Sequence, residues 1–187
     1  MNERLLLQNR EYIEALEQSL LSSKAEVLIV SAYLRSEVLE WARDKIPKSV
    51  LVNIVTRWAP KDLVFGASDL EAYEIARKER WGFYIDQDLH AKAVLVDSDM
   101  LFLGSANFTS RGTHLFGSGN NELGMQVQAS NSEADKIKQL LLVNGYQKLR
   151  LDDKNLTLTK KIPTIAMDLS ALAKGYAVDE IALILEN

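Results

Sequence analysis

Short apolar runs alternate with amphipathic stretches along the first half of the sequence, which leaves few architectures open. The runs are short enough for buried strands, and the stretches between them have the apolar spacing of helices. Strands and helices in alternation favour a sheet that is covered by helices on both faces. We therefore predict an α/β fold with a mixed, largely parallel sheet. The expected strands are residues 25–33, 50–56, 82–85 and 90–97, and the expected helices between them are residues 37–45 and 69–80, capped by Ser36 and Ser68.

The segments on either side of this region carry patterns of their own. Apolar side chains recur at near-helical intervals over residues 4–22, which predicts an amphipathic first helix. Residues 109–121 are rich in Gly, Ser, Thr and Asn, and this composition is typical of a loop. Residues 122–128 alternate polar and apolar side chains as a strand does, and residues 132–149 predict a helix with a leucine-rich face.

Composition limits the function classes that are open to the chain. Of its 187 residues 47% are hydrophobic, which is ample for a buried core. No apolar run reaches the length of about 18 residues that a membrane span needs, and the N-terminus is too charged for a signal peptide, so we expect a cytoplasmic protein. With no cysteine and two histidines, the chain offers no His/Cys zinc site, and we expect neither metal nor cofactor. The net charge of −4 means that any nucleic-acid surface must be a local concentration of positive charge.

The C-terminal residues differ in pattern from the rest. We expect a main domain over residues 1–150 and a C-terminal extension over residues 151–187. Residues 152–155 indicate a turn or linker, and residues 168–186 predict two short helices that are interrupted at Gly175. This extension would dock on the domain, contribute to a dimer, or begin a further domain.

The run from His90 to Asn107 has the pattern of a β-hairpin with polar side chains at its open end. Alternation along the first strand places His90 and Lys92 on one face. Ser98-Asp99 suits a turn, and the strand after it would return Ser105 and Asn107 to the start of the first. An imidazole, an ammonium, a hydroxyl and an amide would then lie together.

These residues also carry a resemblance to a known family. His90-x-Lys92, then Asp97, then Gly104-Ser105-x-Asn107 have the spacing of the HKD motif, so the chain over residues 25–130 resembles the phospholipase D superfamily. Asn107-Phe108-Thr109 and Asn121-Glu122 are similar to the small bacterial endonucleases and restriction-enzyme domains of that superfamily. The resemblance implies a phospholipase D-like fold and a metal-independent phosphodiesterase. It also implies a phosphohistidine intermediate and two such motifs in each active site.

The chain holds a single copy of the motif, so the resemblance implies a homodimer with both His90 residues at the interface. One His90 would attack phosphorus, and the other would protonate the departing alkoxide. Lys92 would neutralise the phosphate, Asn107 with Ser105 would donate hydrogen bonds, and Glu122 would orient the imidazole. Asp97 belongs to the motif, but at the far end of its strand it is also suited to organising the turn. For Glu122 the alternative is an ordinary exposed carboxylate on a strand.

Residues outside the hairpin are candidates for holding the substrate. Arg57 and Trp58, directly after an expected strand, and Arg111, in the expected loop, could bind the phosphates or bases of a nucleic acid. A solvated arginine and a core tryptophan are the alternatives. His114 lies in the same loop, and we expect it to have no catalytic role.

Three functions remain open to a chain with these residues. The first is an endonuclease that cleaves DNA, or RNA, as the catalytic part of a restriction or defence enzyme. The second is a phosphodiesterase that acts on a lipid headgroup or another small diester, although no basic amphipathic helix points to a membrane. The third is a module that binds nucleic acid without cleaving it, which would not need a nucleophile.

Overall fold

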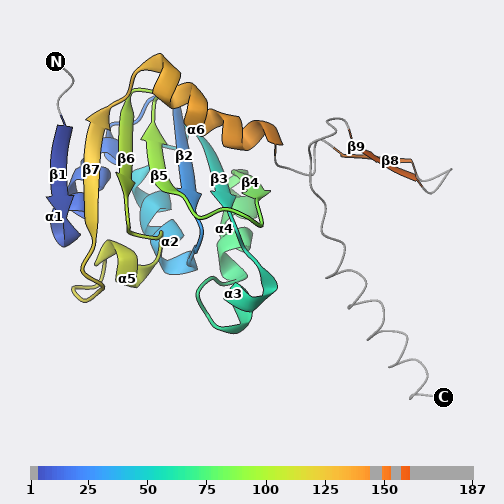
Figure 1. Ribbon diagram of the computed structural model, residues 1–187, viewed down its shortest axis with the longest axis horizontal. Coiled ribbons are helices and arrows are strands. Elements are labelled where there is room, and N and C mark those ends of the chain that lie inside the picture. Colours follow the sequence, from blue (N-terminus) through green and yellow to red (C-terminus); the bar gives the residue numbers. More distant parts are fainter. Residues whose placement is uncertain (1–3, 144–148, 153–156, 161–187) are drawn as a thin grey trace. The chain divides into compact units, whose positions relative to one another are not determined.

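The computed structural model describes residues 4–143, 149–152 and 157–160. A seven-stranded sheet in the order β1-β7-β6-β5-β2-β3-β4 carries helices on both faces (Figure 1). Its strands are β1 (Arg4–Gln8), β2 (Glu26–Ser31), β3 (Leu51–Thr56), β4 (Gly82–Ile85), β5 (Lys92–Val96), β6 (Met100–Gly104) and β7 (Leu123–Gln128). The helices are α1 (Asn9–Leu21), α2 (Ser36–Lys45), α3 (Pro60–Val64), α4 (Glu71–Glu79), α5 (Ser110–Thr113) and α6 (Asn131–Val143).

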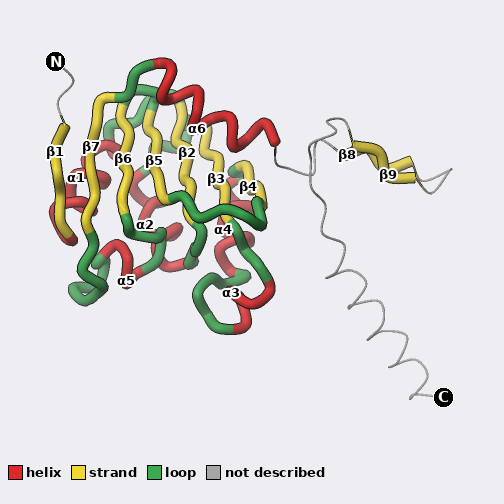
Figure 2. The backbone as a smooth tube through the Cα atoms, in the orientation of Figure 1, coloured by secondary structure: helices red, strands yellow, loops and turns green. Residues whose placement is uncertain are grey.

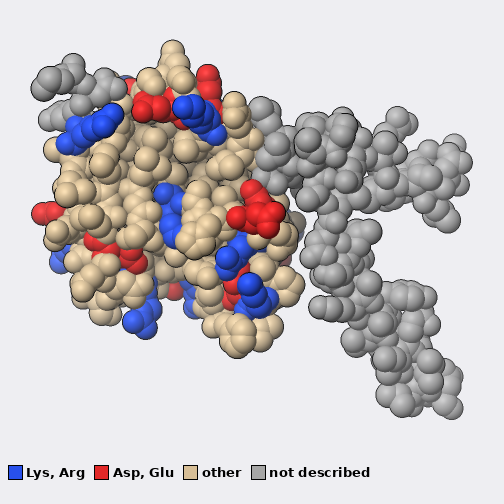
Figure 3. Space-filling model, viewed as in Figure 1, with Lys and Arg blue, Asp and Glu red and all other residues tan. Residues whose placement is uncertain are grey.

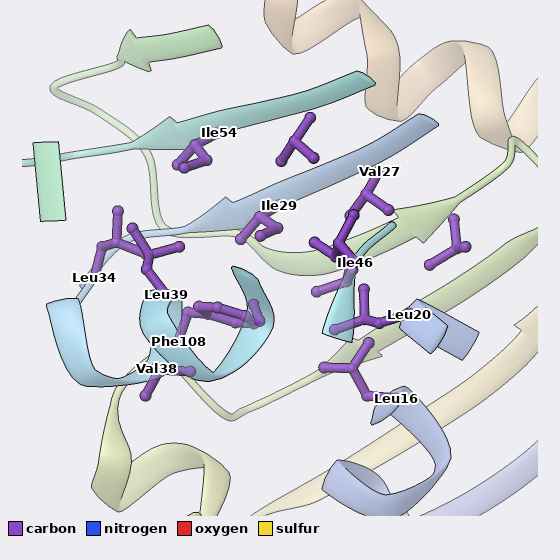
Figure 4. Packing of buried hydrophobic residues seen from close by; sticks show 14 of the residues in the cluster. Leu16, Leu20, Val27, Ile29, Leu34, Val38, Leu39, Ile46, Ile54 and Phe108 are labelled. Atoms are coloured by element: carbon purple, nitrogen blue, oxygen red, sulfur yellow. The ribbon is translucent and has the colours of Figure 1, made fainter. Parts of the chain in front are cut away.

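Two hydrophobic clusters lie on opposite faces of the sheet because side chains alternate along each strand. In β2, Val27 and Ile29 belong to the cluster that α1, α2 and α4 cover, whereas Leu28 and Val30 belong to the cluster that α6 covers. Figure 4 shows the first cluster, where side chains of the helices meet those of the central strands. Each fully buried leucine or isoleucine contributes about 1.5–3 kcal/mol by leaving water. The core is thus divided by the sheet, and β2 is buried on both faces, as its apolar sequence predicts.

The predicted mixed sheet with helices on both faces is confirmed, but the prediction that it is largely parallel is wrong. Only β2–β3 and β3–β4 are parallel pairs among the described strands, whereas β1–β7, β7–β6, β6–β5 and β5–β2 are antiparallel. The parallel pairs are those whose strands are joined through helices. A tight turn joins β5 to β6, and such a connection allows only antiparallel pairing.

The prediction of a helix over residues 4–22 is wrong at its start. Residues Arg4–Gln8 form β1, which pairs antiparallel with β7, and α1 begins at Asn9. The backbone N–H of Gln8 donates to the carboxylate of Glu11 at 3.0 Å, which helps to fix the helix start there. Local spacing suggested a helix, but the edge of β7 offers these five residues backbone hydrogen bonds instead.

Ser36 and Ser68 are not the N-cap residues of α2 and α4, contrary to prediction. Ser36 is the first residue of α2, and its N–H and hydroxyl both donate to the carboxylate of Asp69. The hydroxyl of Ser68 accepts from the N–H of Leu34 at 3.1 Å, and α4 begins later, at Glu71. Asp69 also accepts from the N–H of Ala72, so it is the aspartate that satisfies the start of α4.

The chain divides into two units, residues 1–147 and 148–187. Of the second unit the structure describes an antiparallel pair, β8 (Leu149–Asp152) and β9 (Thr157–Lys160). Of the helix predicted over residues 132–149, the structure describes α6, Asn131–Val143; residues 144–148 lie outside the described residues, and Leu149 begins β8. The linker predicted at residues 152–155 and the two helices predicted within residues 168–186 lie wholly or largely outside the described residues. Among the described helices, none is both long and apolar enough to cross a membrane.

Candidate active site

The open end of the β5–β6 hairpin lies at the sheet edge where β2, β3 and β6 end and where β5 begins. Loops gather along this edge, where binding residues usually concentrate (Figure 2). A hollow of about 480 Å³ lies at this open end of the hairpin. It is lined by His90, Ala91, Lys92, Gly104, Ser105 and Asn107. Every polar residue that the hairpin pattern placed at this end therefore lines one hollow.

His90 and Lys92 lie against each other at the mouth of the hollow. His90 precedes β5 and is exposed, while Lys92 begins the strand and is half-buried. The ammonium Nζ of Lys92 lies 3.0 Å from Nδ1 of His90 and donates to the carbonyl oxygen of His90 at 2.7 Å. These contacts hold the imidazole from its Nδ1 side. Nε2 is consequently the ring nitrogen that is left for a ligand.

The ammonium of Lys92 loses its proton more readily than that of a lysine in water, because its pKa is lowered. Burial lowers the pKa of Lys92, the positive charge of Arg57 lowers it further, and the carboxylate of Glu122 acts in the opposite direction. A desolvated ammonium of this kind interacts strongly with an incoming anion. The hollow is thus prepared for a negatively charged group, which would replace the water that Lys92 has lost.

Ser105 and Glu122 form the second wall of the site. The hydroxyl of Ser105 donates to Oε2 of Glu122, and Asn120 donates to Oε1 of the same carboxylate at 3.2 Å. No hydrogen bond joins Glu122 to His90 among the described residues, so the carboxylate orients Ser105 in this structure. Gly104 makes the close approach possible, because a Cβ atom there would lie 2.8 Å from the carbonyl oxygen of Leu123.

Asn107 is fixed through its carbonyl side. Its Oδ1 accepts from the N–H of Tyr33 at 3.2 Å, which leaves the donor Nδ2 for the hollow. The next residue, Phe108, is buried in the core under α2 (Figure 4), and its N–H donates to Ser31 at 2.8 Å. The end of β2 therefore anchors the segment that follows β6, and the amide of Asn107 is positioned by the core.

Asp97 lies at the opposite end of β5 and has no part in this hollow. Its carboxylate accepts hydrogen bonds from the backbone N–H groups of Lys24, Ala25 and Glu26 at 2.8–3.2 Å. Burial alone would raise the pKa of Asp97, but these three donors hold it below its usual value. The turn is centred on Asp97 and Ser98, which both have positive φ, so the turn predicted at Ser98-Asp99 is one residue off. The structure gives Asp97 the structural role that the sequence left open.

Arg57 and Trp58 differ in how near they come to the hollow. Arg57 extends over the ring of Tyr33, 4.8 Å from its centroid, and its guanidinium makes two 2.8 Å hydrogen bonds to Asp62. The hydrogen bonds with Asp62 raise the pKa of Arg57, and its charge is felt at Lys92. Trp58 packs against Tyr73 and Phe83 and donates through Nε1 to the carbonyl of Asp69, so much of its ring belongs to an aromatic cluster.

Arg111 lies in the short helix α5, and His114 directly follows that helix. Arg111 is exposed and lines a second hollow rather than the one at His90. His114 ends α5 with a positive φ, and its Nε2 contacts the carbonyl oxygen of Asn120. Two further residues of the site, Tyr33 and Asp62, hold Asn107 and Arg57 and were not predicted from the sequence. Neither residue stands in a recognisable motif, so no local signal could have found them.

The described residues show no group of three or more His, Asp or Glu side chains that could hold a metal ion. The hollow supplies an imidazole, an ammonium, a hydroxyl and an amide, with one carboxylate behind them. This is a set of donors and a nucleophile, suited to a phosphate group.

Comparison with protein families decides the relationship of the chain. The family model of the ApbE family matches residues 70–187, which is more than half of the sequence. The chain belongs to the ApbE family. None of the curated proteins matches the sequence. The matched residues include β4 to β7, the whole candidate hollow and the second unit.

The assignment to the phospholipase D superfamily, which the HKD spacing suggested, is therefore wrong. That inference depended on a few positions of one hairpin, whereas the family match extends over residues 70–187. Strand alternation and a tight turn bring polar residues together at the end of any hairpin with this spacing, so the arrangement is weaker evidence of descent than a match along the chain.

The fold is nevertheless that of phospholipase D-family structures, as predicted. NucT from Helicobacter pylori superposes with a TM-score of 0.55 and 14% identity, covering 77% of this chain and 98% of the other. Nuc from Salmonella typhimurium, a phospholipase D family member, gives 0.53 and 14%, covering 73% and 91%. Phosphatidylserine synthase from Haemophilus influenzae gives 0.50 and 14%, covering 75% and 38%. At such identity the likeness concerns the fold alone.

Proposed function

We propose that this chain is a phosphodiesterase that cleaves DNA at the hollow at the open end of the β5–β6 hairpin, through a covalent phosphohistidine and without a metal ion. The observation that carries the proposal is the contact between Lys92 and His90 inside that hollow. It combines a nucleophile with a partly desolvated cation at the position where an anionic phosphate would sit. A fold shared with a phospholipase D family member agrees with this chemistry.

The steps follow from the positions of the groups. For Nε2 of a neutral His90 to attack, the ring proton must lie on Nδ1, so the ammonium of Lys92 leaves Nδ1 and turns to the incoming phosphate. Nε2 then attacks phosphorus, a P–N bond forms, and the P–O bond to one alkoxide breaks. Lys92 and Nδ2 of Asn107 stabilise the negative charge on the non-bridging oxygens. A protonated imidazole gives its proton to the leaving alkoxide, and water then cleaves the P–N bond to restore His90. The one hydroxyl hydrogen of Ser105 is donated to Glu122 in this structure, so Ser105 can donate to the phosphate only after it turns away from that carboxylate.

One imidazole cannot serve as nucleophile and as general acid in the same step. A symmetric homodimer that brings two copies of His90 together would supply the second imidazole. The sheet face that carries α6 offers a surface for such contact, because Leu6, Met125 and Leu103 lie opposite one another across β1, β7 and β6. Leu6 is 64% exposed and Leu103 is 37% exposed. Figure 3 shows few charged side chains over this part of the face.

The test is cleavage of plasmid DNA, RNA and phospholipid vesicles in EDTA, beside His90→Ala. We expect DNA nicking that persists in the chelator and is lost in His90→Ala. The matched control is His114→Asn, at the other histidine, which should retain the activity. Activity that needs a divalent ion, or that survives in His90→Ala, would overturn the mechanism. Cleavage of phospholipid alone would move the substrate to lipids, and binding of DNA without cleavage would leave a binding module.

The shared site has its own test. Light scattering should give the mass of a dimer, and Leu103→Glu, which places a charge on the proposed contact face, should give a monomer with little activity. A mixture of His90→Ala with Leu103→Glu is the control for exchange between subunits. It should be no more active than Leu103→Glu alone, because a mixed dimer holds only one His90. A fully active monomer would rule out the shared site.

Membership of the ApbE family, whose members are flavin transferases, favours a second candidate. In that case the hollow would hold the phosphate of a flavin nucleotide, and the acceptor would be a hydroxyl group in place of water. The residues that line the hollow suit a phosphate, but apart from His90 none offers a ring for stacking on a flavin. Incubation with FAD and mass spectrometry of the products separates the two candidates, because a transferase releases AMP and a DNA-cleaving enzyme leaves FAD intact.

A further inference from the structure

A second hollow, of about 360 Å³, lies next to the first along the chain. Asn107 lines the first hollow and Thr109 lines the second, so a single residue, Phe108, separates them in sequence. On the other side, Asn120 lines the second hollow and donates to Glu122, which accepts from Ser105 in the first. A hydrogen-bonded wall thus connects the two hollows, and a ligand longer than one phosphate would meet both.

The second hollow has one cation that is free to take an anion. Arg35 donates to the carbonyl oxygen of Gly66 at 2.8 Å and pairs with the carboxylates of Glu37 and Asp69. Arg111 lines the same hollow, is exposed, and pairs with no acidic side chain among the described residues. A guanidinium in this position can bind a phosphate in a two-pronged manner.

An exposed aromatic residue directly precedes one of the residues that line the second hollow, on a loop that is held in place. Phe65 is 85% exposed, and the next residue, Gly66, lines the hollow. The loop is held from three sides: Arg35 bonds Gly66, Arg57 bonds Asp62, and Ser68 bonds Leu34. The ring of Phe65 is therefore presented to solvent by a braced segment, α3 and its flanks, which project from the sheet edge in Figure 1. A ring on which a base stacks benefits from such a fixed loop, because little conformational entropy of the loop is lost on binding.

We infer that this second hollow is the subsite for the nucleotide next to the scissile phosphate of an unpaired strand. The base stacks on Phe65 and its phosphate binds Arg111. The inference rests on the proposed cleavage of a nucleic acid and names the form that is bound. In a duplex, both faces of a base are covered by its neighbours, so a phenylalanine ring reaches a base face only where the strand is unpaired.

Binding to a labelled single-stranded oligodeoxynucleotide and to the same sequence as a duplex tests the subsite. All variants carry His90→Ala, so that cleavage does not disturb the measurement. Phe65→Ala should weaken single-strand binding about tenfold, within the range of one stacked base, and Phe65→Trp should restore it. Duplex binding should change little. Arg111→Ala should weaken the binding and reduce its salt dependence by about one counterion.

Matched controls are Leu51→Ala, which removes another exposed apolar side chain at the far end of β3, and Arg10→Ala, which removes another exposed arginine. Both should bind like the parent. Unchanged single-strand affinity in Phe65→Ala, or an equal loss for duplex and single strand, overturns the subsite, as does an unchanged salt dependence in Arg111→Ala. Should the unsubstituted chain cleave no nucleic acid, the proposed function fails on that result alone, independently of these affinities.

Discussion

The two ends of the β5–β6 hairpin use the same kinds of polar residue in opposite ways. At the closed end, the carboxylate of Asp97 has three backbone N–H donors as partners, and the hydroxyl of Ser98 donates to Glu26. At the open end, Lys92 and His90 bind chiefly to each other, and the donor of Asn107 faces a hollow. The closed end is satisfied within the protein, and the open end is left with capacity for a ligand.

This difference separates stability from chemistry along one short element. A charged group whose partners are all backbone atoms contributes to folding and has little left for a substrate. A cation that is desolvated without a carboxylate partner lowers the folding stability of the free protein. Binding of an anion compensates this loss. Substitutions at the two ends should therefore move different measurements, and each of the following changes tests that separation.

The largest effect is expected at Lys92. Lys92→Ala removes the cation that faces the phosphate, and turnover of a small diester such as bis(p-nitrophenyl) phosphate should fall about 100- to 1,000-fold. Thermal stability should not fall, because the ammonium is partly desolvated and has no acidic partner whose loss would destabilise the folded protein. A variant that loses stability but keeps its turnover would place Lys92 with the structural end of the hairpin.

The pH dependence sharpens this prediction. The pKa of Lys92 is lowered from its ordinary value of 10.5, so the ammonium loses its proton at a lower pH than a lysine in water. Turnover should therefore decline on the alkaline side below pH 10.5. Lys92→Arg, whose guanidinium stays charged above pH 12, should lose that decline while keeping part of the turnover. An alkaline limb that is the same in both proteins would assign it to another group.

Asp97→Ala should give the next largest effect, on stability alone. Three backbone donors lose a charged acceptor, and we expect a loss of about 3 kcal/mol in the free energy of unfolding. Because the folded-state pKa is lowered, this stabilisation is present above the unfolded value of 3.8 and disappears as pH falls through the folded value. Urea unfolding at neutral and acidic pH should show the difference between parent and variant shrinking towards low pH. Turnover per folded molecule should be unchanged; a fall would mean that both ends of the hairpin serve catalysis.

Local periodicity predicted the open end of the hairpin well. His90, Lys92, Ser105 and Asn107 line one hollow because strand alternation and hairpin pairing are set within eighteen residues of sequence. The partners of Asp97 lie more than seventy residues away, at Lys24 to Glu26, and no local pattern announces them. The same holds for β1, whose strand conformation depends on pairing with β7. Hydrogen bonds between a side chain and backbone groups that are distant in sequence could therefore not be predicted from local patterns.

Family and fold also separate in this molecule. The hairpin spacing led to the right fold and the wrong family, because fold depends on the burial pattern of seven strands and descent is recorded over many positions. The two parallel strand pairs were recognisable from the intervening helices, but the antiparallel half required knowledge of which strands meet. Arg57 was predicted as a site residue because it directly follows β3. Its position is fixed by Asp62, which was not predicted as a site residue.

Gly104→Ala should have a moderate effect on both measurements, because Gly104 lines the hollow at the open end and also lies close against β7. The added methyl group would lie 2.8 Å from the carbonyl oxygen of Leu123 and 2.9 Å from the Cα of Gly124, so β6 and β7 must separate. We expect a loss of about 1–2 kcal/mol in unfolding free energy and a several-fold fall in turnover as Ser105 moves. Denaturant unfolding and turnover on one preparation provide the check, and an unchanged protein would mean that the strands tolerate the separation.

Ser98→Gly tests the closed end with the smallest change. Asp97 and Ser98 have φ of 52° and 59°, a conformation that glycine adopts without strain, and Asp-Gly is favoured in two-residue hairpin turns. Relief of strain should outweigh both the entropy of glycine and the lost hydrogen bond to Glu26, for a gain of about 0.5 kcal/mol. A rise of about 1–2 °C in Tm with unchanged turnover is expected. A lower Tm would show that the link from Ser98 to Glu26, which Lys138 also contacts, matters more to this turn than its backbone strain.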